Sequence, residues 1–523
     1  MKKPSAEFAM RHYWILFLGI AVLIAGCSQT VSASDADETS SESSSAKKGS
    51  SSSKKVTSSS SEAEELDEDC AGEPGNAWDG TTAKDFACGA GTKLSPYIIL
   101  TAEQLAKLSF VVGANETEYQ GKYYKLGADI VLNEGKIIDD KGALVADSTK
   151  LHKWTPIGNS SVAFTGNFDG DGHTVSGMFI NTTSTHNGLF GDNQGTILNL
   201  ILENSWISGG NTTGGITGQN GGTIRASKNS ATILGSEKVG GIAGQSNGPY
   251  PKTAAIISCQ NYGTIKGKNF IGGIVGHSYQ ASIDSSTNEG FIEGNNYIAG
   301  IAGKGAYNFV SSYLIDASFL NNNGEILGKK YVGGIFGSCG NDVCSSTYKC
   351  GKTLHLVNIG NVIGEERTGG IFGHYCAGTL KQAANHGNVE GKSYTAGIAG
   401  YIGQSTTENI YNLGNVVGST YVGGIFGHNQ EGVTSAAYST GKVDGDSLVG
   451  LMIGYNYNTT MADYYYLEQG EQEPFGLNNG GGVATPKTSE EMKSEEFAEL
   501  LGEEFVYDPE LNDGYPILKW EEE

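Results

Sequence analysis

A glycine-rich cassette recurs along the chain, and this repeat constrains the fold more than any other feature. Its form is Gly-Gly-Ile-x-Gly, as in the segment 423–427. Ten copies are centred on Gly188, Gly215, Gly241, Gly273, Gly300, Gly334, Gly370, Gly397, Gly424 and Leu451. Most successive copies lie 27 residues apart, and three intervals lengthen to 32, 34 and 36. A unit of this size cannot form its own core, so the units must stack and bury a continuous one.

A second cassette, Asn-x-Gly-x-Ile/Val-x-Gly, keeps a fixed phase to the first. From its first glycine to the second glycine of the next Gly-Gly-Ile cassette the distance is ten residues, as between Gly263 and Gly273 or between Gly414 and Gly424. The longer intervals therefore arise in the other part of the repeat. A repeat with one part of constant length and one part that accepts insertions is typical of a stacked coil with a single variable loop.

The residues between the cassettes are alternating and β-branched, which predicts short strands, with Gly and Asn at corners that need positive φ. The cassette isoleucines should form one internal column, and Ile233 to Val443 a second. A third column, able to hydrogen-bond from coil to coil, contains Asn229, Asn261, Asn288, Asn322, Asn358, Asn385 and Asn412. We expect an all-β fold, a right-handed parallel β-helix of about ten ~27-residue coils with short helical caps at both ends. A β-propeller is the main alternative, but its blades run to ~40 residues or more.

The two cassettes resemble GLUG-motif repeats, a glycine-rich motif of bacterial surface proteins that include some immunoglobulin A-cleaving metallopeptidases. The resemblance covers 188–456, and the flanking segments 154–158 and 512–518 are similar to those of such proteins. Metallopeptidase activity does not follow from it. That chemistry needs two histidines one helical turn apart with a glutamate between them, and none of the nine histidines stands in such a pattern.

The N-terminus resembles the signal peptide of a bacterial lipoprotein. Lys2, Lys3 and Arg11 precede an apolar run that is too short to span a bilayer, and the run ends in Ile-Ala-Gly before Cys27. This resemblance implies cleavage before Cys27, lipid attachment to its thiol and, with Ser28 following, anchoring in the outer membrane. A plain secretory signal is the alternative.

We divide the chain at the changes in composition. The expected parts are a signal peptide at 1–26, a lipid-anchored disordered tether rich in Ser, Lys and Glu at 27–69, an N-terminal cap with first coils at 70–187, the repeat β-helix at 188–456 and a C-terminal cap at 457–523. In the caps we expect a helix from Thr101 to about Val112, a helix from Ser489 to Leu501 and a last strand at 515–520. The caps should cover the sheet edges at both ends.

Charge and composition exclude two classes of protein. The chain has 34 Lys and Arg against 57 Asp and Glu, a formal net charge of −23, so nucleic acid is not an expected partner. The 78 glycines show no three-residue period and there are only 10 prolines, so the chain is not a collagen-like triple helix. No cofactor and no metal ion are expected.

Seven cysteines remain after Cys27, in a compartment that favours disulfides. We expect three pairs: Cys70–Cys88, Cys339–Cys376 on adjacent coils, and Cys344–Cys350 closing an inserted loop. Zinc ligation by the last four cysteines is the alternative. Cys259 falls in an apolar column and should be a buried free thiol.

Aromatic residues are the candidate binding groups. Phe270, Tyr297, Tyr331, Tyr394 and Tyr421 share one column, interrupted by Arg367, and should stack and stabilise the solenoid. The three long intervals carry further aromatics on one edge, where they could stack on sugars or anchor a protein. These are Tyr250, Tyr307, Phe309, Tyr313 and Tyr348.

Other polar clusters have simpler readings. His277, His374 and His428 share one position and are expected to be solvated, and Asp169 and Asp171 are expected to form a turn rather than a calcium site. A glycosidase needs two close carboxyl groups, and the column through Glu293 and Glu390 has no acidic neighbours on adjacent coils. We therefore expect a non-enzymatic surface protein that binds a polysaccharide or a protein. The alternatives are a polysaccharide lyase or hydrolase and a purely structural envelope component.

Overall fold

The computed structural model describes residues 70–522, except 249–253, 307–315, 343 and 345–349. Cys27, with the expected signal peptide and tether, lies outside the described residues, as do Tyr250, Tyr307, Phe309, Tyr313 and Tyr348. What is described belongs to one compact unit, Glu65–Glu523. Within it, none of the helices has the length and apolar character that crossing a bilayer requires.

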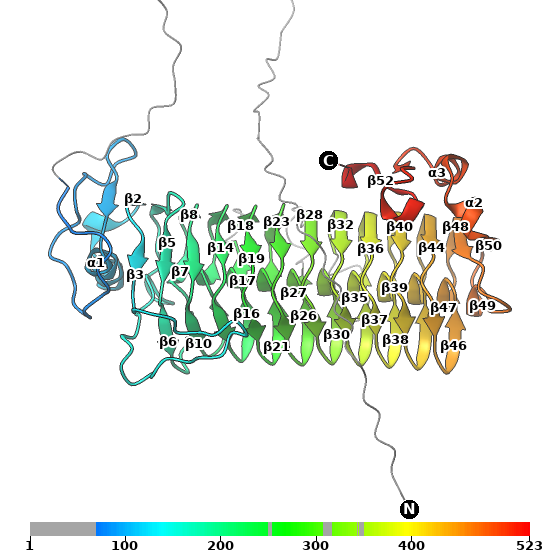
Figure 1. Ribbon diagram of the computed structural model, residues 1–523, viewed down its shortest axis with the longest axis horizontal. Helices are drawn as coiled ribbons and strands as arrows, with labels where there is room; N and C mark the ends of the chain where they lie inside the picture. Colours follow the sequence, from blue (N-terminus) through cyan, green and yellow to red (C-terminus); the bar gives the residue numbers. More distant parts are fainter. Residues whose placement is uncertain (1–69, 249–253, 307–315, 343, 345–349, 523) are drawn as a thin grey trace, which may run out of the picture. The chain divides into compact units, whose positions relative to one another are not determined.

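Four parallel sheets run along the described chain, here called sheets I to IV (Figure 1). Sheet I contains β1 (Tyr97–Ile99), β2 (Tyr123–Leu126), β3 (Ile130–Val131), β4 (Asn167–Asp169), β5 (Thr174–Ser176), β8 (Thr196–Leu198), β9 (Ile201–Glu203), β13 (Thr223–Arg225), β14 (Lys228–Asn229), β18 (Ala254–Ile257), β19 (Gln260–Asn261), β23 (Ala281–Asp284), β24 (Thr287–Asn288), β28 (Asp316–Asn322), β32 (Lys352–Asn358), β36 (Thr379–Asn385), β40 (Thr406–Asn412), β44 (Val433–Ser439), β48 (Thr460–Leu467) and β50 (Ala484–Lys487). Sheet II contains β6 (Phe179–Asn181), β10 (Trp206–Ser208), β15 (Thr232–Leu234), β20 (Ile265–Lys266), β25 (Ile292–Glu293), β29 (Ile326–Leu327), β33 (Val362–Ile363), β37 (Val389–Glu390), β41 (Val416–Val417) and β45 (Val443–Asp444).

The other two sheets follow in the same order along each coil. Sheet III contains β11 (Thr213–Gly214), β16 (Glu237–Gly240), β21 (Asn269–Gly272), β26 (Asn296–Ala299), β30 (Lys330–Gly333), β34 (Glu366–Gly369), β38 (Ser393–Ala396), β42 (Thr420–Gly423) and β46 (Ser447–Gly450). Sheet IV contains β7 (Phe190–Asn193), β12 (Thr217–Asn220), β17 (Ala243–Asn247), β22 (Val275–Tyr279), β27 (Ala302–Ala306), β31 (Phe336–Cys339), β35 (Phe372–Cys376), β39 (Ala399–Gly403), β43 (Phe426–Gln430), β47 (Ile453–Tyr457) and β49 (Phe475–Asn479).

Each coil passes through the four sheets in turn, so the chain is a parallel β-helix and the expected fold class is confirmed. One coil runs through β18 and β19 of sheet I, β20, β21 and β22, and the next coil begins at β23. The strands of successive coils pair in parallel and in the register of the repeat: Ile265 is the Cα partner of Ile233 before it and of Ile292 after it.

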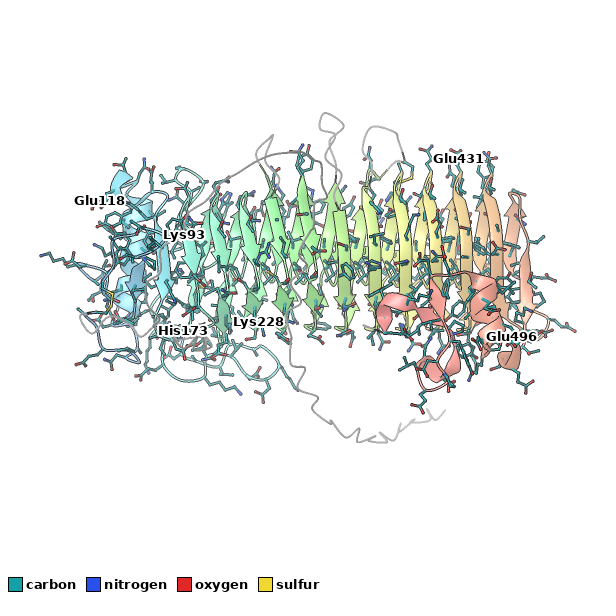
Figure 2. All side chains as sticks on the ribbon, turned by 90° about the horizontal axis from the view of Figure 1, so that it is seen from above. Lys93, Glu118, His173, Lys228, Glu431 and Glu496 are labelled. Atoms are coloured by element: carbon teal, nitrogen blue, oxygen red, sulfur yellow. A yellow bond between two sulfur atoms is a disulfide. The ribbon has the colours of Figure 1, made fainter. Side chains whose placement is uncertain are left out.

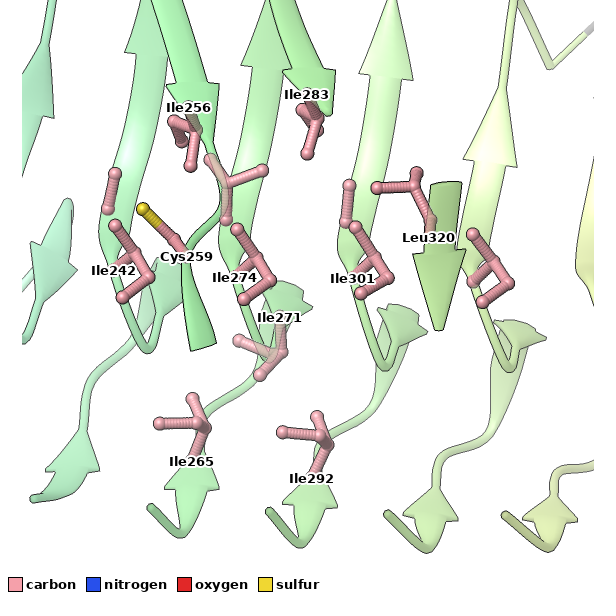
Figure 3. Packing of buried hydrophobic residues seen from close by; sticks show 14 of the residues in the cluster. Ile242, Ile256, Cys259, Ile265, Ile271, Ile274, Ile283, Ile292, Ile301 and Leu320 are labelled. Carbon is pink, nitrogen blue, oxygen red and sulfur yellow. The ribbon is translucent and has the colours of Figure 1, made fainter. Parts of the chain in front are cut away.

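The core is built from columns of β-branched residues, one residue per coil. The cassette isoleucines Ile242, Ile274 and Ile301 form one column and Ile265 and Ile292 belong to another, as Figure 3 shows, and all are fully buried. Cys259 points into the same core as a free thiol, and burial raises its pKa to about 12. Both predicted columns are confirmed.

The predicted asparagine column forms a continuous hydrogen-bonded ladder. The Nδ2 of Asn322 donates to the Oδ1 of Asn358 in the next coil at 2.7 Å and to the carbonyl of Gly324 at 2.9 Å. Equivalent amide–amide bonds of 2.7–2.8 Å link every step from Asn229 to Asn412. These side chains are fully buried, so each amide must find its partners inside the protein.

The cassette glycines are required by close approach and not, as predicted, by positive φ. A Cβ on Gly273 would collide with the Asn288 amide oxygen of the ladder and with the carbonyl of Gly300. A Cβ on Gly276 would collide with the backbone of Lys238 and Val239 in the preceding coil. In these repeats, residues with side chains occupy the corners of positive φ, among them Phe270 at 58°.

The N-terminal end of the solenoid is covered by α1 (Ala102–Gly113), the predicted helix. Thr101 is its N-cap and forms a capping box with Gln104. Leu105 and Leu108 of the helix are fully buried in the core that the first coils share. A short 3₁₀ helix, η1 (Thr117–Tyr119), leads into β2.

The C-terminal segment lies on the side of the solenoid, contrary to the prediction that it caps the end (Figures 1 and 2). It contains α2 (Ser489–Met492), α3 (Glu495–Leu501), β51 (Phe505–Val506), η2 (Asn512–Gly514), β52 (Ile517–Leu518) and η3 (Lys519–Glu521). Its apolar side chains form a cluster with Tyr411 and Tyr438 on the outer side of sheet I. Sheet I presents aromatic rings on that side, and burying them there is what fixes the segment.

Two details of this segment also differ from prediction. The single helix expected from Ser489 is two helices with Thr488 and Ser494 as their N-caps, because the Ser494 side chain accepts a hydrogen bond from the amide of Phe497 and begins a new helix. Within the described part of the chain, the expected last strand pairs with β51 alone, in antiparallel fashion, and does not extend the solenoid. The last strand of sheet I is β50, where Pro486 lacks the N–H group that edge pairing uses.

The ladder predicts that alanine substitution destabilises the protein much more at Asn322 than at the adjacent Asn323. Asn322→Ala should lower the free energy of unfolding by roughly 2–5 kcal/mol, because buried amide groups of Asn288 and Asn358 lose a partner. Asn323→Ala should cost about 0.5 kcal/mol or less, since that side chain is exposed. Chemical denaturation of the two variants measures the difference, and equal losses would contradict the ladder's role.

The glycines allow a second test. Gly273→Ala should destabilise the protein by about 3 kcal/mol or more, because the added methyl group meets rigid backbone and the ladder. Gly113→Ala, at the end of α1 with open space around it, should be neutral or stabilise by about 0.5–1 kcal/mol. Thermal unfolding midpoints compare the two, and a tolerant Gly273 would refute the close-approach explanation.

Candidate binding face

Outward side chains of sheets III and IV form two adjacent columns, which we call the aromatic face. The sheet III column contains Lys238, Phe270, Tyr297, Tyr331, Arg367, Tyr394 and Tyr421. The sheet IV column contains His277, Lys304, His374, Tyr401, His428 and Tyr455. The two columns meet because the last cassette glycine lets the backbones approach: the rings of Phe270 and His277 lie 5.5 Å apart.

The sheet III rings stack from coil to coil, as predicted. Ring centroids are 4.9 Å apart for Phe270 and Tyr297, 4.6 Å for Tyr297 and Tyr331, and 4.6 Å for Tyr394 and Tyr421. The Arg367 guanidinium, in the coil between the two stacks, lies 5.2 Å from the ring centroid of Tyr331 and 5.9 Å from that of Tyr394. Cation–π contact therefore continues the column where an aromatic residue is missing.

These rings occupy an unfavourable backbone conformation. Tyr297, Tyr331, Tyr394 and Tyr421 have φ of 55° to 61°, a region that costs a bulky residue of the order of 1–3 kcal/mol and that Asn or Gly adopts more readily. At a corresponding corner of sheet I most residues are small or polar. That corner holds Ser258, Ser285, Phe319, His355, Gln382, Asn409, Ala436 and Asp463. The fold therefore requires the conformation but not the aromatic rings, which remain half-buried at the surface.

The three histidines of the sheet IV column were expected to be solvated, but they are largely buried. His374 is fully buried, and its pKa is lowered to about 3 by burial, with Arg367 nearby. Burial also lowers the pKa of His277 and of His428 to about 4. The cause is packing between rings, such as His428 against Tyr455 at 4.8 Å. All three are neutral at pH 7.

One ion pair organises the middle of the face. Lys304 Nζ lies 3.1 Å from Asp342 Oδ1 and 4.7 Å from the centroid of the Tyr297 ring. The Tyr297 hydroxyl donates to the other oxygen of Asp342 at 2.6 Å. Hydrogen bonds from Tyr297 and Lys304 hold the Asp342 pKa below its usual value in spite of burial. Because Asp342 follows β31 in the chain, these contacts hold the start of the next segment against the aromatic face.

The disulfides correct the predicted pairing next to this face. Cys70–Cys88 is present as predicted, but the others are Cys339–Cys350 and Cys344–Cys376. The Cα partner of Cys339 across the coils is Tyr375, so Cys376 is one position further and its side chain points to the opposite face of the strand.

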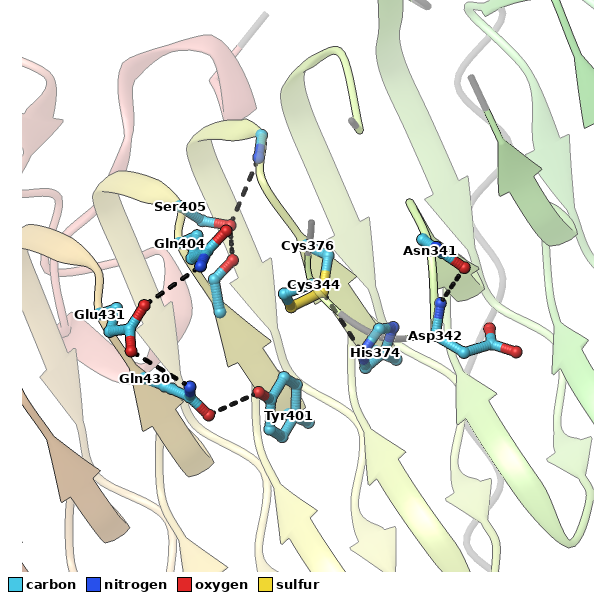
Figure 4. The surroundings of a disulfide bond; sticks show 12 residues. Asn341, Asp342, Cys344, His374, Cys376, Tyr401, Gln404, Ser405, Gln430 and Glu431 are labelled. Atoms are coloured by element: carbon cyan, nitrogen blue, oxygen red, sulfur yellow. Dashed lines mark hydrogen bonds between the residues drawn. A yellow bond between two sulfur atoms is a disulfide. The ribbon is translucent and has the colours of Figure 1, made fainter. Parts of the chain in front are cut away.

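His374 lies beside the Cys344–Cys376 disulfide, with its Nε2 3.4 Å from Cys376 Sγ (Figure 4). Cys344, His374 and Cys376 together have the residue types of a metal site. All four sulfurs of the zinc alternative are bonded in pairs in this structure, so they are not available as thiolate ligands.

The acidic candidates take structural roles. Asp169 Oδ1 accepts hydrogen bonds from the amide of Asp171 and from the Asn199 side chain, and the Asp171 carboxylate pairs with Lys125 at 3.2 Å. Glu293 pairs with Lys266 at 2.9 Å. In the strand register Glu390 lies between Ile363 and Val417, so this column brings no two carboxyl groups together.

The three insertions share one corner of the solenoid, as predicted. They leave between β17 and β18, between β27 and β28, and between β31 and β32, where the chain passes from sheet IV to sheet I. That corner borders the aromatic face on the sheet IV side.

Sequence reasoning missed the sheet IV members Lys304, Tyr401 and Tyr455. A signal was present, because each stands four residues after the centre of a cassette, in the register of the histidines.

No protein-family model matches the chain. Two curated proteins are similar to parts of it. Halomucin of Haloquadratum walsbyi is 33% identical over 167 residues, which is 31% of this chain and 2% of Halomucin. A protein of Evansella cellulosilytica, provisionally named a Gly-rich membrane protein, is 33% identical over 145 residues, 27% of this chain and 15% of that protein.

Among solved structures, the chain is similar to the crystal structure of a provisionally assigned immunoglobulin A1 protease from Bacteroides ovatus. The identity is 18% and the TM-score 0.34, over 84% of this chain and 98% of the other. The matched parts are small fractions of the curated relatives and extend over most of this solved chain.

The lowered histidine pKa values predict acid sensitivity. Because the unfolded chain has ordinary histidine pKa values near 6.5, it binds more protons than the folded protein between about pH 6.5 and pH 4, so stability should fall as the pH drops through this window. The double variant His277→Phe/His428→Phe should lose less stability over the same window, whereas His173→Gln, outside the face, should behave like wild type. Denaturation curves at pH 7, 5.5 and 4 test this, and an unchanged pH dependence in the double variant would contradict it.

Proposed function

We propose that the protein is a GLUG-type surface lipoprotein of a bacterial envelope whose solenoid binds a polysaccharide through the aromatic face. The observation that carries the proposal is the row of half-buried rings, two stacks joined by Arg367, at positions of positive φ where the fold does not require aromatic residues. The presence of bulky rings at such positions points to a use beyond folding.

The geometry of the face suits a sugar polymer. The rings are fixed at regular intervals along a rigid sheet and stack on one another, so a ligand meets them as a row of ring edges, and little conformational entropy is lost when it binds. Arg367, Lys304 and the Tyr401 hydroxyl add polar groups beside the rings. The aromatic residues of the inserted loops, Tyr250, Tyr307, Phe309, Tyr313 and Tyr348, belong to the same proposal as a second set of contacts.

Location at the envelope is part of the proposal. The lipobox resemblance at Cys27 supports attachment to the outer membrane through acyl chains. The name of the Evansella protein, a Gly-rich membrane protein, is consistent with a membrane-associated relative. A tethered solenoid at the cell surface would serve adhesion to the bound polymer.

Depletion from solution tests the function. The full-length protein is mixed with insoluble cellulose, chitin and xylan, and we expect saturable removal by at least one of them. Tyr331→Asn/Tyr394→Asn/Tyr421→Asn should bind at least tenfold more weakly, because Asn accepts positive φ but offers no ring. Tyr262→Asn, at an exposed tyrosine outside the face, is the matched control.

Each other outcome has a defined meaning. Binding that the triple variant retains would move the site to the loop aromatics, which a variant with all five replaced by alanine then tests. No removal by any polysaccharide would contradict the glycan proposal and favour a protein partner or a structural role. Release of reducing ends from a bound polymer would instead support the enzyme alternative.

A further inference from the structure

The aromatic face contains a pocket of about 310 Å³ near its N-terminal end. Its lining includes Lys238 and Phe270 of the sheet III column, His277 and Lys304 of the sheet IV column, and Tyr279 beside them. Gly340 and Asn341 close it on the side of the insertion that follows β31. Three successive coils and one inserted segment thus contribute to a single hollow.

His277 lines the pocket and has unused hydrogen-bonding capacity. Among the residues that the structure describes, neither ring nitrogen has a hydrogen-bond partner, although both are buried from solvent. Buried polar atoms are normally satisfied, and an orphaned pair in a pocket indicates a missing partner. The neutral imidazole offers one N–H donor and one acceptor nitrogen there.

The charges around His277 are unbalanced. Lys238 Nζ donates to the Gln245 side chain at 2.8 Å, and Lys304 pairs with Asp342 at 3.1 Å. Of these two ammonium groups, one therefore has a neutral partner and keeps its full charge at the pocket. The chain as a whole has a formal net charge of −23, so the positive charge at this pocket is opposite in sign to that of the protein around it.

The apolar wall completes the set of groups. The Phe270 ring stacks on His277 at 5.5 Å, and Tyr279 lies 6.3 Å from the same imidazole. An aromatic platform, two ammonium donors and a neutral donor–acceptor ring match a sugar that carries a carboxylate: the ring stacks on Phe270, the carboxylate accepts from the lysines, and a hydroxyl group pairs with His277.

We propose that this pocket binds a uronic acid residue and that the polysaccharide recognised by the aromatic face is anionic. The inference rests on the proposed glycan-binding function and adds the substrate class. It makes Lys238, whose charge is not paired, the main residue that selects a charged sugar over a neutral one, with Lys304 as a second donor.

The test compares two forms of one polymer. The full-length protein is titrated with polygalacturonate and with its methyl ester, which has the same backbone but no charge. We expect at least tenfold tighter binding of the acid form. Lys238→Asn/Lys304→Gln should remove this preference, and Lys228→Gln, at an exposed lysine of sheet I, should leave it unchanged. Unchanged thermal midpoints verify that the variants are folded.

The outcomes separate this inference from the function on which it rests. Equal binding of the two forms, or a preference that survives in the double variant, overturns the uronate pocket and leaves the glycan function standing. Binding of neither form also overturns the uronate pocket, and the depletion experiment with neutral polysaccharides then decides the glycan function by itself.

Discussion

The hydrogen-bonded asparagine ladder is the interaction on which the rest of the structure depends. From Asn261 to Asn412 each buried amide bonds to the next coil and to a backbone carbonyl of its own coil, so the coils are held at one spacing and in one register. The second glycine of the cassette, such as Gly273, lies against the ladder, where any side chain would collide with the amide oxygen. Two residue types that look like loop formers in the sequence are therefore packing requirements.

The same close approach creates the aromatic face. Because the last glycine of the cassette lets sheet III and sheet IV come together, outward rings from both sheets meet within each coil, as Phe270 and His277 do. Stacking between coils then joins the pairs into a row, and packing among the rings removes the histidines from solvent and keeps them neutral. Surface and core share one repeat, so a periodic core necessarily produces a periodic surface.

The two ends of the chain are used differently. The helix α1 closes the first coils, while the C-terminal segment covers aromatic rings on the outer side of sheet I. The last strand of sheet I, β50, is left with a proline that disfavours edge pairing. The inserted loops concentrate at the corner between sheet IV and sheet I, beside the aromatic face. Variable length and the candidate binding groups therefore lie next to each other.

The sequence by itself determined the coil length, the internal columns, the ladder of Asn229 to Asn412 and the stacked column of Phe270 and Tyr331, because a strict repeat places equivalent residues directly above one another. It could not determine features that depend on contacts between unlike parts. Cys376 pairs with Cys344 and not with Cys339 because Cys339 and Cys376 face opposite sides of their strands. The position of α3 against Tyr438, the burial of His374 and the pocket around His277 were decided only when distant segments packed together, since burial and proximity are properties of the folded arrangement and not of the repeat.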